Sequence, residues 1–60
     1  YQFVNVQAMV HSLGRLEEVE IIEKVGDNRY IAEYKGKRYS AIFNIFAGVY
    51  YMDDLYGEVQ

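Results

Sequence analysis

Residues 17–43 read EEVEIIEKVGDNRYIAEYKGKRYSAIF, and this stretch decides the predicted fold. Apolar and polar residues alternate along it, which is the period of a β-strand with one buried face. Gly26-Asp27 and Lys35-Gly36 interrupt the alternation with residue pairs that suit two-residue hairpin turns. The pattern therefore predicts an antiparallel meander with strands at about 18–25, 29–34 and 37–43.

The two turns fix a register whose consistency can be checked. The second turn opposes Ala32 to Tyr39, and the first turn, closed by Val25 and Asn28, opposes Ile21 to Ala32. Both assignments place the same side chains on one face, and a one-residue slip in either turn would break that agreement. The predicted core face consists of Val19, Ile21, Tyr30, Ala32, Tyr34, Tyr39, Ala41 and Phe43.

The segment before the meander shows a helical period. Its apolar residues recur at i, i+3, i+4 and i+7, with Asn5 as a helix N-cap and Gly14 as a C-cap. This spacing predicts a helix over about 5–13, whose apolar stripe is formed by Val6, Met9, Val10 and Leu13.

The segment after the meander predicts one further strand at 49–52, and residues 55–59 fit either a short fifth strand or a tail. We therefore expect a single α+β domain over 1–60, with the N-terminal helix packed on a four- to five-stranded antiparallel meander. The alternative is a small SH3-like barrel, in which Leu55–Val59 closes the sheet against the first strand.

Charge and composition exclude several function classes. The chain has six Lys and Arg against nine Asp and Glu, and this net charge of −3 disfavours binding to nucleic-acid phosphates. Cysteine is absent, which removes disulfides, thiolate zinc sites and thiol nucleophiles. No apolar run reaches the roughly 18 residues of a membrane span. We expect a cytoplasmic protein that binds neither nucleic acid nor membranes.

The residues that could carry chemistry are few. His11 is the single histidine, and the acidic cluster of Asp53, Asp54 and Glu58 lacks the glycine-centred pattern of a calcium loop. A solvated turn is the expected role of this cluster, and cation binding is the alternative. No Ser-His-Asp set and no phosphate-binding loop is present, so we expect no enzyme activity, no cofactor and no metal.

Two further features have a structural and a functional interpretation. The seven tyrosines could stack nucleic-acid bases, but three of them fall on the predicted core face, which favours a structural role. An acidic run along the first strand predicts either a solvated edge or a partner-binding face. The run consists of Glu17, Glu18, Glu20 and Glu23.

Residues 29–57 also show a resemblance to a known group of sequences. The matching pieces are Ala41-Ile42-Phe43-Asn44, Gly48-Val49-Tyr50-Tyr51 and Asp53-Asp54-Leu55-Tyr56-Gly57. They resemble short proteins encoded on conjugative or phage-like mobile elements of anaerobic gut bacteria. The resemblance implies a mobile-element accessory protein and supplies no activity and no catalytic residues.

These observations favour a non-enzymatic protein-interaction module that self-associates or binds another protein. One helix covers only one face of a sheet, so the second face stays exposed in a monomer. The candidate interface on that face is Ile22, Ile31 and Ile42 with Tyr50 and Met52 or, in the other strand orientation, Val49 and Tyr51. The alternative function is a mobile-element or phage regulator that inhibits a host protein through the acidic face.

Overall fold

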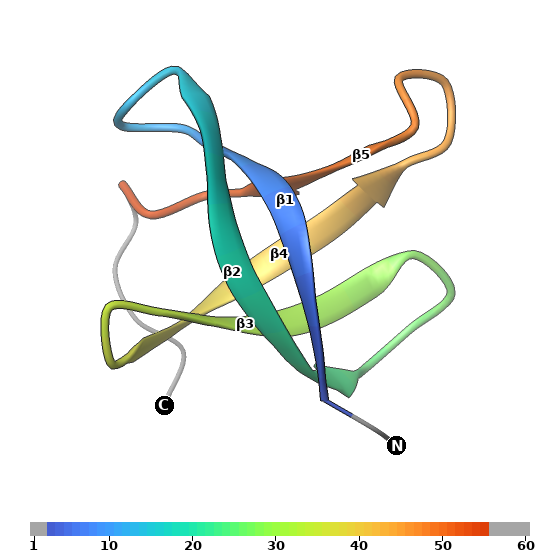
Figure 1. The fold of residues 1–60 in the computed structure, drawn as a ribbon. Coiled ribbons are helices and arrows are strands. Elements are labelled where there is room, and N and C mark those ends of the chain that lie inside the picture. Colours follow the sequence, from blue (N-terminus) through green and yellow to red (C-terminus); the bar gives the residue numbers. More distant parts are fainter. Residues whose placement is uncertain (1–2, 56–60) are drawn as a thin grey trace.

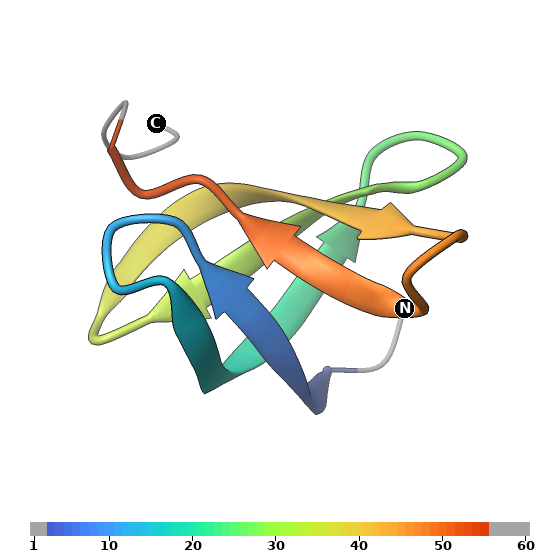
Figure 2. The same cartoon turned by 90° about the horizontal axis from the view of Figure 1, so that it is seen from above.

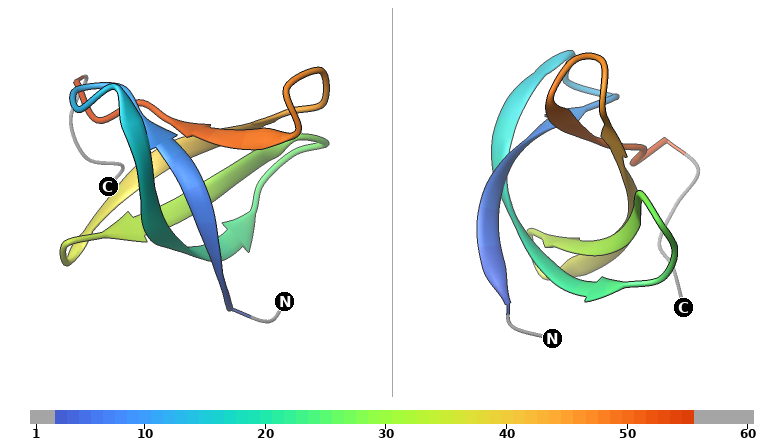
Figure 3. Two further views of the ribbon diagram at one scale, coloured as in Figure 1. Left: turned by 45° about the horizontal axis from the view of Figure 1, so that its top comes forward. Right: turned by 90° about the vertical axis from the view of Figure 1, so that its right-hand side faces the viewer.

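The computed structural model describes residues 3–55, which form a closed barrel of five strands (Figure 1). Each strand pairs with the next in antiparallel hairpins, and the last strand pairs in parallel with the first. Figure 2 shows the last strand lying between the first and the fourth, and the end view in Figure 3 shows the ring that this closure makes. The strands are β1 Val4–Val10, β2 Arg15–Lys24, β3 Arg29–Tyr34, β4 Lys37–Asn44 and β5 Val49–Met52.

The predicted α+β fold is wrong, because the segment expected to be a helix over 5–13 forms most of strand β1 and the turn that follows it. The apolar residues of this segment fit both a helical and a strand spacing. Val6, Met9, Val10 and Leu13 follow a helical stripe, but every second residue from Val4 to Val10 is also apolar or small. An isolated helix of nine residues is marginally stable, whereas β1 gains backbone partners from β2 and β5 on its two edges.

Gly14 ends β1 in a hairpin turn and does not cap a helix. Its φ is +65°, and the amides of Leu13 and Gly14 both donate to the carbonyl of Val10, at 3.1 and 2.8 Å. A single helix-like turn closed by a glycine in the left-handed region serves a hairpin as well as a helix end. Asn5, predicted as an N-cap, lies within β1.

The predicted strands at 29–34, 37–43 and 49–52 are confirmed as β3, β4 and β5. The alternative of a small SH3-like barrel fits the closed architecture, but the closing strand is β5, which pairs with β1. Leu55 lies in a turn, and the rest of the predicted strand 55–59 is outside the described residues. Within residues 3–55 the structure contains no helix long and apolar enough to cross a membrane.

The predicted register is confirmed between β3 and β4, where Ala32 lies opposite Tyr39, and at the Ile21–Ala32 pair of β2 and β3. The predicted register between β2 and β3 is wrong nearer the turn that joins them. A β-bulge at Ile22 shifts the pairing by one residue, so that Glu23 lies opposite Ile31. The bulge adds the local bend that a wall of few strands needs to close.

The core is small and lies inside the barrel. Three of its seven fully buried residues are alanines, which suits the narrow interior of a five-stranded barrel. Half-buried tyrosines pack around this centre, which confirms the structural role predicted for Tyr30, Tyr34 and Tyr39. The seven residues are Ala8, Val10, Val19, Ile21, Ala32, Ala41 and Met52.

Candidate functional site

The five residues predicted as an interface do not share one face of the barrel. Met52 is 1% exposed in the core, and the Tyr50 ring contacts the rings of Tyr30 and Phe43 edge-on at centroid distances of 5.4 and 4.9 Å. Ile22 lies in the β2 bulge and Ile31 in β3, both half-buried. Only Ile42, which is 51% exposed, presents most of its side chain to solvent.

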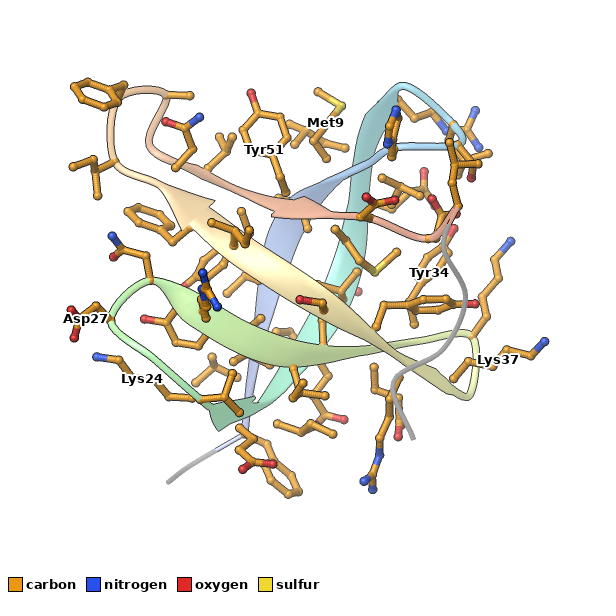
Figure 4. The ribbon with its side chains drawn as sticks, turned by 180° about the vertical axis from the view of Figure 1, so that it is seen from behind. Met9, Lys24, Asp27, Tyr34, Lys37 and Tyr51 are labelled. Carbon is orange, nitrogen blue, oxygen red and sulfur yellow. The ribbon has the colours of Figure 1, made fainter. Side chains whose placement is uncertain are left out.

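A different set of apolar side chains meets on the outer surface. The register places Leu16 beside Met9, Met9 beside Tyr51, and Tyr51 beside Ile42. We call these four residues, from β2, β1, β5 and β4, the apolar row. Leu16 and Tyr51 are 45% and 41% exposed, and Figure 4 shows Met9 and Tyr51 next to each other. Three strand spacings make the row about 14 Å long along the wall.

The row has charges of opposite sign beyond its two ends. Arg29 of β3 lies opposite Ile42 and extends the row on one side. On the other side, β2 carries Glu18 and Glu20, which alternate with the buried Val19 and so face outward. Because β3 also pairs directly with β2 and carries Glu33 on the same outer face as Arg29, the charges around the row have both signs.

The acidic run on β2 is divided between the two faces of the wall. Glu17 lies opposite the fully buried Ala8, and its carboxylate accepts hydrogen bonds from Arg15 Nε at 3.0 Å and from the Tyr34 hydroxyl at 3.3 Å. Across β3 and β4, Glu33 and Arg38 form a cross-strand pair, with Nε and Oε2 4.0 Å apart.

The histidine and the two aspartates that could carry acid–base chemistry lie at one end of the barrel, where they make contacts between two segments. The Asp54 carboxylate accepts hydrogen bonds from the Ser12 hydroxyl and, at 2.9 Å, from the Ser12 amide. The hydroxyl is the main cause that holds the pKa of Asp54 below its ordinary value of 3.8. His11 Nδ1 lies 3.5 Å from Asp53 Oδ1, and both side chains are about half exposed. These contacts join the β1–β2 hairpin to the segment that follows β5.

Within residues 3–55, no three His, Cys, Asp or Glu side chains are grouped so as to hold a metal ion. Glu58, the third member of the predicted acidic cluster, lies outside the described residues. The carboxylate of Asp53 accepts the amide of Leu55 at 3.2 Å, and that of Asp54 is engaged by Ser12. Hydrogen bonding to the local backbone is typical of aspartates in turns.

An open pocket of about 320 Å³ lies at the same end of the barrel. Leu13 and the two aromatic residues Tyr34 and Tyr39 supply its apolar surface, and Lys35 places its ammonium 5.3 Å from the centre of the Tyr34 ring. The full lining is Ser12, Leu13, Tyr34, Lys35, Lys37, Tyr39 and Asp54, which we call the end pocket.

Comparison of the chain with protein-family models, with curated proteins and with solved structures finds no match. The candidate site therefore rests on the geometry of the barrel. Met9 and Leu16 were not predicted as interface residues, because Met9 was assigned to the buried stripe of a helix and Leu16 lay between that helix and the first predicted strand. The apolar or small residues at every second position, Val4, Val6, Ala8 and Val10, are the signal that places Met9 between them on the outer face.

Proposed function

We propose that this chain is a non-enzymatic protein-interaction module that self-associates through the apolar row. The observation that carries the proposal is the juxtaposition of Leu16, Met9, Tyr51 and Ile42 on four adjacent strands. Exposed apolar residues scattered singly are normal, but a continuous row across a sheet is typical of an interaction surface.

The charges beside the row favour one orientation of a second copy of the chain on this surface. A two-fold axis that runs along the strands between β1 and β5 sets the β2 side of one copy against the β4 side of the other. Glu18 of β2 then approaches the β4 end of the partner's row and lies away from Glu18 of the other copy. An axis across the strands would instead bring Glu18 of one copy toward Glu18 of the other, which like-charge repulsion disfavours.

The centre of such a dimer consists of Met9 and Tyr51 from each copy. A methionine thioether packs favourably against an aromatic ring, and tyrosine is enriched at interfaces. Four side chains on each copy form a smaller contact than a standard protein–protein interface. We therefore expect a weak dimer, with a dissociation constant on the order of 10–100 µM.

Sedimentation equilibrium at about 100 µM tests the proposal, because a dimer of this strength is well populated there. Ile42→Lys and Tyr51→Lys introduce a charge into the row and are expected to give monomers. Ile31→Lys is the matched control, since it makes the same change on neighbouring β3 outside the row, and it should leave the dimer intact. A monomeric parent protein, or a dimer that only Ile31→Lys disrupts, would refute the proposal.

A further inference from the structure

The two ends of the barrel present surfaces of different shape. At one end lies the β4–β5 hairpin, whose residues 45–48 we call the tip. Phe46 in the tip is 95% exposed, and Ile45 beside it is also exposed. The β1–β2 turn, the β3–β4 turn and the segment after β5 lie at the opposite end (Figures 1 and 3), and their residues line the end pocket.

Local hydrogen bonds hold the tip in one shape. The side-chain oxygen of Asn44 accepts the amides of Phe46 and Ala47, at 2.9 and 3.0 Å, and the Asn44 carbonyl accepts the amide of Gly48 at 2.7 Å. Gly48 has a φ of +72°, which lets the chain turn back into β5. A preorganised tip loses little backbone freedom when Phe46 enters a partner.

The end pocket has the size and lining to receive a phenyl ring. A closed cavity of about 150 Å³ is enough for benzene, and this open pocket measures about 320 Å³. Leu13, Tyr34 and Tyr39 offer apolar and aromatic contacts on its walls. Aromatic pairs add stability beyond the area that they bury.

We infer that Phe46 of one copy inserts into the end pocket of the next copy. Figure 4 shows Asp27, in the loop at the tip end, and Lys37, at the pocket end, on opposite sides of the molecule. Both ends carry charges of both signs, with Lys24 and Asp27 at the tip end and Lys35 and Asp54 at the pocket end, so the fit of the Phe46 ring to the pocket carries the inference. A heterologous contact of this kind leaves a free tip and a free pocket, and it extends into chains unless the rotation closes a ring.

This inference does not depend on the apolar row, and the Tyr51→Lys background separates the two contacts. A small contact of this kind is weak, so the experiment needs a high protein concentration. In the Tyr51→Lys background, sedimentation velocity at about 500 µM should show species heavier than a dimer. Phe46→Ala removes the inserted ring, and Leu13→Lys places a charge in the pocket wall. Each change alone should weaken association at least tenfold, while Phe3→Ala, the matched loss of another exposed phenylalanine, should leave it unchanged.

Mixing the two variants gives the deciding result. The Phe46→Ala chain keeps its pocket and the Leu13→Lys chain keeps its tip, so an equimolar mixture should form a 1:1 dimer that does not extend. Circular dichroism of each variant confirms that the barrel is folded. A Tyr51→Lys protein that stays monomeric at 500 µM, a Phe46→Ala variant that associates like its parent, or a mixture no heavier than its components would overturn the inference.

Discussion

Val10→Ala and Met9→Ala separate the observed strand from the helix that the sequence also allows. Val10 is fully buried in the barrel, whereas Met9 points outward and is half-buried. In a helix the two residues would share the apolar stripe, and both truncations would remove core volume. In β1 they lie on opposite faces of the wall, so that only Val10→Ala opens a cavity.

The magnitude follows from burial. Val10→Ala removes two carbon atoms from a site with no exposed surface. At about 0.8 kcal/mol per buried carbon the transfer cost is about 1.6 kcal/mol, and the cavity raises it to about 2–3 kcal/mol. Met9→Ala should cost less than about 1 kcal/mol, because its side chain is partly solvated in the folded state. A core of this size supplies only about 3–5 kcal/mol in total, so Val10→Ala removes about half of the stability.

Urea denaturation followed by tyrosine fluorescence measures both changes. The protein is kept at low micromolar concentration, because association through Met9 would otherwise add to the stability. With an m-value of about 1 kcal/mol/M, the Val10→Ala midpoint should fall by about 2 M and the Met9→Ala midpoint by less than half of that. Equal shifts for the two variants, or a larger shift for Met9→Ala, would show that the residues do not alternate across a barrel wall.

Two further predictions concern the turns. The lowered folded-state pKa of Asp54 means that its hydrogen bonds with Ser12 stabilise the barrel above about pH 3.8 and lose that effect as the pH falls through the folded-state pKa. Urea midpoints measured from pH 7 to pH 2 should therefore fall more steeply for the parent than for Asp54→Asn, and parallel curves would contradict this assignment. Gly48→Ala should cost about 1–2 kcal/mol from its positive φ alone, because an added Cβ meets nothing within 4 Å. Gly26→Ala, where no positive φ is required, is the control and should cost less in the same urea titration.

The row and the end pocket were less accessible to sequence reasoning than the strands. The outward position of Ile42 was predictable from alternation along β4, but Leu16, Met9 and Tyr51 become its neighbours only when the barrel closes. The end pocket likewise combines three segments distant in the chain, around Ser12, around Lys35 and at Asp54. A local sequence pattern does not show which distant segments become neighbours, because alternation indicates only which face of one strand is buried.

The meander could be predicted from the sequence, because turn residues and alternating side chains are local properties. Lys35-Gly36 set the β3–β4 register correctly, and both residues adopt positive φ as a tight hairpin turn requires. Residues 4–10 fit both a helical and a strand periodicity, and only long-range pairing selects the strand. Their strand conformation depends on the parallel pairing of Ala8–Val10 with Tyr50–Met52, about forty residues away. That pairing gives β1 a partner on each edge and encloses Val10 in the core, which a short isolated helix could not match.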